Sequence, residues 1–191
     1  MHPHGVRHCV ACDDILGDHM RIGLIIIVVV IIFDQLTKRL AAAMVPEGHS
    51  VIAIRALLEF GYHKNFGISF GLLAGQQLLF ALITIVALTL FGYLFLDVDF
   101  RQRKVYSTAI ALFIGGTFGN AIDRALLGYV IDFLHFPFLT IPLSWVGLSN
   151  FYNNIADLAL SAAIVLFLID IFIFEPKRHA KKEAADHVTD H

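Results

Sequence analysis

Charged residues are scarce in this 191-residue chain, at 16% of the sequence, whereas ordinary globular domains carry about 25%. No long basic run occurs, which argues against nucleic acid as a partner. Apolar residues reach 58%, and phenylalanine alone contributes 17 residues. The composition therefore excludes a soluble domain and indicates an all-α integral membrane protein, because helices satisfy their own backbone groups in lipid.

Cysteine is almost absent, and Cys9 and Cys12 both lie near the start of the chain. A structural zinc site takes four ligands from an ordered frame, so we expect no metal there. Met20 precedes a strongly apolar run, and residues 1–19 are interpreted as a cytoplasmic extension or a disordered tail. No small-residue cleavage site follows that run, which argues against a cleavable signal peptide.

Long apolar stretches take the place of the missing charges, and crossing a bilayer requires about 20 such residues. Four stretches meet this length and predict membrane-spanning helices within one domain, residues 20–175, followed by a charged cytoplasmic tail, residues 176–191. The first carries Asp34 and Lys38 in its far half, where the i,i+4 spacing places the opposite charges on one helical face. The predicted helices cover residues 22–45, 71–96, 105–122 and 151–174.

The connecting segments are predicted to be short and mostly irregular. Alternation around residues 50–55 indicates a strand within the polar segment 46–64. Residues 65–70 are interpreted as a polar entry loop. Prolines interrupt residues 133–151, which predicts an interfacial loop with a short helix. The sequence thus predicts four transmembrane helices with a small extracytoplasmic region of strand and loop.

The distribution of positive charge predicts the orientation. Nine Lys and Arg residues flank the side that carries both termini, and five lie on the other side. The positive-inside rule then places the N- and C-termini in the cytoplasm. Five polar residues converge near the outer face in this arrangement: Asp34, Asn65, Asn120, Asp132 and Asp157.

Asp132 and Asp157 lie at the outer ends of consecutive predicted spans, so the loop between them can bring their carboxyl groups together. Two close carboxyl groups at low dielectric share a proton, and aspartic proteases use one as a base and the other as an acid. No pairing of serine with histidine or lysine has a defensible spacing, and the HExxH pair of zinc peptidases is absent. The two aspartates are the leading catalytic candidates.

Other charged residues have plainer interpretations. Asp123 and Arg124 form an interfacial charge pair in the simplest interpretation, although Arg124 could also orient a carboxylate or the backbone. Asp34 with Lys38 is interpreted as structural. Asp170, near the inner face, is interpreted as a solvated helix end.

The remaining polar or small residues of interest are assigned packing roles. Gly115, Gly116 and Gly119 are expected to let helices approach closely, as small residues do in membranes. His63 and His135 are interpreted as interfacial side chains rather than metal ligands.

Five motifs lie in order on the four-span pattern: FDQLTK (33–38), NFGISFG (65–71), GGTFGNAIDR (115–124), GYVIDF (128–133) and NNIAD (153–157). Together they resemble the motif set of bacterial lipoprotein signal peptidase, the type II signal peptidase. The resemblance covers roughly Met20 to Phe174. The chain departs from the usual pattern at Asn153, where phenylalanine is expected, and at Ser69, where alanine is common. Both changes bear on local packing and leave the acids intact.

The resemblance implies that Asp132 and Asp157 are catalytic in an intramembrane aspartic endopeptidase without metal or cofactor. It further implies a monomer in the bacterial plasma membrane that contacts membrane lipid. Its site would lie near the extracytoplasmic face, and its substrates would be prolipoproteins cut before a diacylglyceryl-modified cysteine. The supporting or substrate-binding residues would be Asp34, Lys38, Asn65, Gly67, Asn120, Arg124 and Asn154.

A transporter and a scaffold protein are the two alternative classes of function. A proton-coupled transporter would also use intramembrane acids, but its acids should span the membrane depth and its sequence should repeat internally. We find no repeat, and the acids gather at one face. A scaffold protein would explain the small residues but not two converging aspartates.

Overall fold

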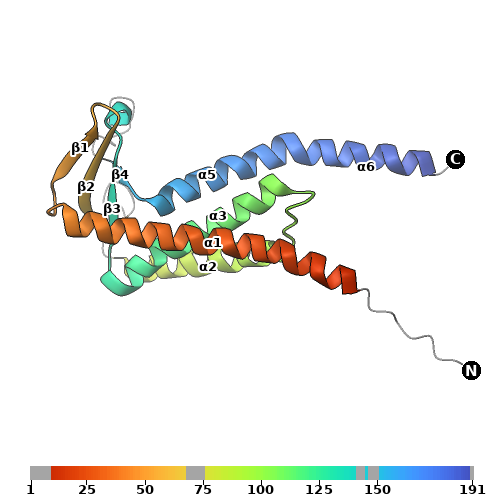
Figure 1. The fold of residues 1–191 in the computed structure, drawn as a ribbon, viewed down its shortest axis with the longest axis horizontal. Helices are drawn as coiled ribbons and strands as arrows, with labels where there is room; N and C mark the ends of the chain where they lie inside the picture. Colours follow the sequence, from red (N-terminus) through yellow and green to blue (C-terminus); the bar gives the residue numbers. More distant parts are fainter. Residues whose placement is uncertain (1–9, 68–75, 141–144, 146–150, 190–191) are drawn as a thin grey trace, which may run out of the picture.

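The computed structural model describes residues 10–67, 76–140, 145 and 151–189, and it is mostly helical. Long helices lie side by side, and a small sheet stands across one end of the bundle (Figure 1). Within the described residues, four helices are long and apolar enough to span a membrane, as predicted. They are Met20–Met44, Gln77–Phe95, Lys104–Leu127 and Ile155–Lys181.

The first helix, α1, runs from Val10 to Met44 and so begins before the apolar run. The expectation of disorder through residue 19 is therefore wrong from Val10 onward. Helix growth is cooperative, so adding turns to an existing long helix costs much less than starting a new one. Residues 1–9 lie outside the described part of the chain.

The next two helices differ from prediction mainly at their ends. Helix α2 covers Gln77–Phe95, and the predicted start at residue 71 lies outside the described residues. Helix α3 covers Lys104–Leu127, five residues past the predicted end. It stops where Gly128 adopts a left-handed conformation with φ of 78°, a conformation that glycine reaches without steric cost.

The last span combines three elements into one long helix. Helix α5, Ile155–Ile169, continues through the π-helical segment η3, Asp170–Phe174, into α6, Glu175–Thr189. The start of α1 and the end of α6 both point away from the sheet (Figure 1).

Helix α3 is central and packs against α1, α2 and α5. Its glycines allow this, as predicted. A Cβ atom on Gly115 would lie 2.9 Å from Val30 Cβ, and one on Gly116 would lie 2.7 Å from the Ala156 carbonyl oxygen. Real Cβ atoms do not approach so closely, so larger residues would push α1 and α5 away from α3.

The sheet is antiparallel, with strands in the order β1–β2–β3–β4. Strand β1, Ser50–Ile54, confirms the predicted strand. Strands β2, Leu58–Asn65, and β4, Tyr152–Asn153, were not predicted.

Strand β3, Val130–His135, corrects the prediction of a loop from residue 133, while the predicted short helix is present as η2, Pro137–Leu139. Five of the six residues of β3 are buried, so its apolar run lacks the polar alternation that marks a half-exposed strand.

Candidate active site

Asp132 and Asp157 come from different kinds of element. Asp132 lies on β3 and is 2% exposed, so it follows the third span rather than ending it. Asp157 lies in the first turn of α5. The sequence places them 25 residues apart, and one intervening side chain contacts both.

That side chain is Asn154, which is fully buried. Its Nδ2 donates a hydrogen bond to Asp132 Oδ1 at 2.6 Å. Its Oδ1 accepts one from the backbone N–H of Asp157 at 2.9 Å, and its own backbone N–H donates to Asp157 Oδ2 at 3.1 Å. The reciprocal pair forms a capping box at the start of α5, so a single asparagine couples the position of one carboxyl group to the other.

Each carboxyl group has a second amide donor. Asn65 Nδ2 donates to Asp132 Oδ2 at 2.8 Å, and Asn120 Nδ2 donates to Asp157 Oδ1 at 2.8 Å. The carbonyl oxygen of the Asn65 side chain accepts a bond from the Gly67 backbone N–H at 3.0 Å. This bond fixes which end of the Asn65 amide faces Asp132. Asn65, Gly67, Asn120 and Asn154 are all brought to the site.

Asp132 is the more deeply buried carboxyl group. Its pKa is raised to about 7, mainly because burial disfavours the carboxylate and also because Asp157 is near. The N–H donors of Asn65 and Asn154 and the charge of Lys38 oppose this rise. Asp157 sits instead at a helix N-terminus, whose positive end favours a negative charge. The two carboxyl groups therefore differ in their local surroundings, one on a strand and one in the first turn of a helix.

A buried charge cluster underlies the site and centres on Lys38. Its Nζ lies 2.8 Å from Asp34 Oδ2, 2.9 Å from Asn120 Oδ1 and 3.2 Å from Asp123 Oδ2. Lys38, Asp34 and Asp123 each have fully buried side chains. Three acceptors match the three donors of a lysine ammonium. Through Asn120, the cluster reaches Asp157.

The two acids of this cluster also hold backbone groups beside the site. Asp34 Oδ1 accepts the Ala156 N–H at 2.8 Å, at the start of α5. Asp123 Oδ2 accepts the Ile131 N–H at 3.1 Å, next to Asp132 on β3. The i,i+4 pairing of Asp34 with Lys38 is present as predicted. Together, Asp34 and Asp123 bind both elements that carry the candidate acids.

The position of Asp123 differs from the predicted one. We expected it to pair with Arg124 at the interface, but it is fully buried and contacts Lys38, Gln35 and Ile131. The guanidinium of Arg124 lies over the Phe80 ring, 4.6 Å from its centroid. Arg124 remains within electrostatic range of Asp157 and Asp132. Asp123 lies three residues after Asn120, a spacing that shares one helical face and could have predicted their common partner.

Gln35 is a further residue that the sequence analysis did not single out. Its Nε2 donates to the Gly119 carbonyl at 3.0 Å and to Asp123 Oδ1 at 3.1 Å. It thereby joins α1 to α3 beside the charge cluster. Its place next to Asp34 in the first motif was the available signal.

Residues set aside in the sequence analysis lie apart from the two carboxyl groups or in other contacts. Asp170 is not a solvated helix end: it is 1% exposed, and Arg178 binds it with contacts of 2.6 and 2.9 Å. His63 and His135 both stack on Tyr152, and His135 contacts Glu59. Cys9 and the side chain of Cys12 lie outside the described part of the structure.

Comparison with known proteins decides the family. The family model described as signal peptidase (SPase) II matches residues 26–173. This chain belongs to the signal peptidase II family. It is accordingly an aspartic peptidase of a bacterial membrane-enzyme family.

Relatives within the signal peptidase II family are similar over nearly their whole length. The lipoprotein signal peptidase of Latilactobacillus sakei is 32% identical over 84% of this chain and 99% of its own. That of Halalkalibacterium halodurans is 35% identical over 83% and 96%. A bacterial membrane enzyme solved by the in meso method at 1.9 Å resolution superposes with a TM-score of 0.67, at 33% identity, over 79% of this chain and 92% of that one.

Proposed function

We propose that this signal peptidase II removes the signal peptide from prolipoproteins, cutting before a cysteine that carries a diacylglyceryl group, with Asp132 and Asp157 as its catalytic pair. The observation that carries the proposal is Asn154, which contacts both carboxyl groups and sets their mutual position. Membership of the family supports the reaction class, and the motif resemblance supports the substrate.

In the proposed reaction, Asp157 is ionised and Asp132 is protonated. The Asp157 carboxylate takes a proton from water while the water oxygen bonds to the scissile carbonyl carbon, and Asp132 gives its proton to the carbonyl oxygen. The resulting diol then collapses and the C–N bond breaks. Asp157 returns its proton to the leaving nitrogen, and a diol hydroxyl returns one to Asp132. The reaction consumes only the substrate and water, and both carboxyl groups return to their starting protonation states.

The supporting residues act through these two groups. Asn65 and Asn154 hold Asp132, and Asn120 and the capping box hold Asp157. Lys38 and Asp34 act indirectly. Lys38 binds the side chain of Asn120, and Asp34 binds the backbone at the start of α5. Arg124 lies within electrostatic range of both carboxyl groups, and in the proposed reaction it offsets negative charge that develops beside them.

We also propose an orientation and a location. Both termini lie in the cytoplasm, and the sheet and the two acids lie at the extracytoplasmic face of the bacterial plasma membrane. The excess of positive residues on the terminal side supports this orientation. The protein works as a monomer on substrates that arrive by diffusion within the bilayer.

A processing assay tests the proposed function. Purified protein in phospholipid vesicles is mixed with a prolipoprotein that bears the diacylglyceryl cysteine and with the same prolipoprotein unmodified. We expect mass spectrometry to detect a mature product beginning at the modified cysteine, and no cut in the unmodified chain. Absence of cleavage by folded protein would contradict the proposal and favour a proton-coupled transporter, for which proton flux across vesicles is the next measurement.

A further inference from the structure

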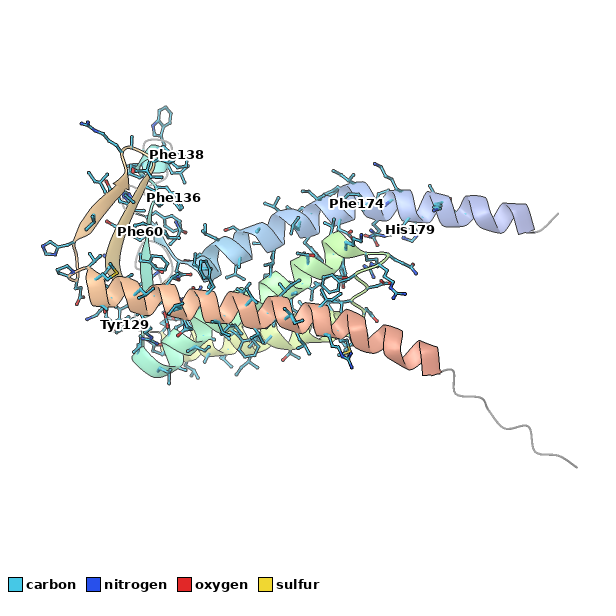
Figure 2. All side chains as sticks on the ribbon, in the orientation of Figure 1. Phe60, Tyr129, Phe136, Phe138, Phe174 and His179 are labelled. Carbon is cyan, nitrogen blue, oxygen red and sulfur yellow. The ribbon has the colours of Figure 1, made fainter. Side chains whose placement is uncertain are left out.

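An apolar groove lies beside the last turns of α1, where the helix meets the sheet. Its volume is about 360 Å³, and both elements contribute its walls. Figure 2 labels Phe60 on the sheet, near the end of α1. Its lining includes Leu40, Ala41 and Met44 of α1 and Val51, Phe60 and Phe133 of the sheet.

The groove is separate from the two carboxyl groups. Phe133 lines it, and Phe133 directly follows Asp132 on β3. Successive side chains of a strand face opposite sides of the sheet, so the side chains of Phe133 and Asp132 point in opposite directions. Asn65 and Asn154, which bind Asp132, are absent from the lining residues.

The lining offers little to a polar ligand. Thr37 is the one polar residue among the described residues that line the groove. Its hydroxyl already donates within α1, at 2.7 Å from the Phe33 carbonyl and 3.0 Å from the Asp34 carbonyl. Apolar cavities without free hydrogen-bonding groups stay dry or bind apolar ligands. The chemistry therefore selects a hydrocarbon.

An exposed apolar stripe leads along α1 into the groove. Its members recur every three or four residues, the spacing of one helical face. Leu40 and Met44 belong both to the stripe and to the groove, and Met44 is 77% exposed. The stripe lies within a membrane-capable helix, so an acyl chain could follow it from the bilayer into the groove over apolar surface throughout. Its members are Ile25, Val29, Ile32, Leu36, Leu40 and Met44.

We propose that this groove binds one acyl chain of a bilayer phospholipid, wedged between α1 and the sheet. The bound chain packs against Phe133 and so supports the strand that carries Asp132. The exposed stripe of α1 connects the groove to the bilayer, whereas the asparagines that bind the two carboxyl groups do not line it. A phospholipid is therefore the occupant that the position of the groove favours.

A pair of tryptophan variants tests this binding. Ala41→Trp fills the groove from α1, whereas Ala43→Trp places the same side chain at an exposed position that does not line it. Each protein is purified in mild detergent, supplied with palmitoyl-oleoyl phosphatidylglycerol and examined by native mass spectrometry. We expect a retained phospholipid on the wild type and Ala43→Trp, and its loss from Ala41→Trp. Equal retention by both variants, or equal loss, would overturn the proposal.

A second variant that fills the groove from another element shows whether misfolding of the first explains its result. Val51→Trp closes the groove from β1, and circular dichroism with thermal unfolding establishes that each variant is folded. Loss of the phospholipid from both filling variants supports the proposal, and retention by a folded Val51→Trp variant contradicts it.

A competition arm separates the bilayer lipid from the substrate's lipid. Diacylglyceryl-modified prolipoprotein is added to Asp157→Asn protein that already holds the phospholipid. Simultaneous binding of both supports the proposal, whereas one-for-one displacement assigns the groove to the substrate's acyl chain and overturns it. If the proposed function fails, the tryptophan variants still decide whether the groove holds phospholipid, because their readout does not depend on cleavage.

Discussion

At the residue scale, the environment of Asp132 predicts how the reaction depends on pH. Its pKa is raised to about 7, chiefly by burial. The proposed mechanism needs Asp132 protonated, so cleavage should fall as pH rises through about 7 and the proton leaves. It should fall again in acid, when Asp157 also becomes protonated. The measurement is kcat/KM for a prolipoprotein from about pH 5 to about pH 9; a rate still rising above about pH 8 would contradict the assignment.

The same shift bears on stability. Folding raises the pKa of Asp132 from 3.8 to about 7, so this residue stabilises the folded state most when its carboxyl group is protonated. Its contribution is fully present below the unfolded pKa and is lost as pH rises from about 4 to about 7.

Lys38 supplies a second prediction at this scale. Lys38→Met leaves Asp34 and Asp123 buried without their cation, and breaking a buried pair in this way costs about 3–5 kcal/mol. The double variant Lys38→Met, Asp34→Asn removes one of those buried charges, so it should lose less stability than Lys38→Met alone. Thermal unfolding in a single detergent measures both. Unchanged stability of Lys38→Met, or a more severe loss in the double variant, would show that the cluster is not held by this charge balance.

Much at this scale could be predicted from the sequence, and the exceptions have a common cause. The pairing of Asp34 with Lys38 follows from helical spacing, and both are where that spacing placed them. Asp123 was misassigned because neighbouring residues on a helix point in different directions, so Asp123 faces Lys38 while Arg124 lies over Phe80. Sequence adjacency suggested a pair that the helix geometry separates.

At the element scale, close packing of α3 against α1 and α5 depends on glycine. A Cβ atom on Gly119 would lie 2.7 Å from Asp34 Oδ2 and 3.1 Å from Ala156 Cβ. We expect Gly119→Ala to reduce stability by about 1–3 kcal/mol through overpacking and to lower activity, because Asp34 holds the start of α5.

Gly92→Ala is the matched control on α2, where nothing lies within 4 Å of the added atom. It should leave stability unchanged or raise it by about 0.5–1 kcal/mol, since alanine favours a helix. Thermal unfolding and prolipoprotein cleavage are measured for both. A Gly119→Ala protein indistinguishable from Gly92→Ala would rule out the packing explanation.

The helices could be predicted at this scale, but most of the sheet could not. Hydropathy locates a membrane helix because about 20 apolar residues are needed in one stretch. Strand β3 is short, and most of it is buried, so its sequence resembles the end of the preceding helix. Its partner β2 lies 65 residues earlier at Asn65↔Val130, a pairing that no local pattern contains.

At the scale of the whole molecule, the proposed orientation is directly testable. His49 lies between α1 and β1, on the sheet side, and Gln102 lies in the α2–α3 connection. Single cysteines are introduced at each position after Cys9 and Cys12 are changed to serine. In intact cells a membrane-impermeant maleimide should label His49→Cys, and Gln102→Cys should be labelled only after permeabilisation. The reverse pattern would invert the topology and place the two acids on the cytoplasmic side.

Asp132 and Asp157 are proposed to act together as the catalytic pair, and a comparison of four proteins tests this pairing. Cleavage of a diacylglyceryl-modified prolipoprotein is measured for the wild type, Asp132→Asn, Asp157→Asn and Asp97→Asn, the last an exposed aspartate between α2 and α3. We predict that both variants of the pair insert and fold but lose cleavage, while Asp97→Asn retains it. Substantial cleavage by either Asp132→Asn or Asp157→Asn would show that the two carboxyl groups do not act as a catalytic pair.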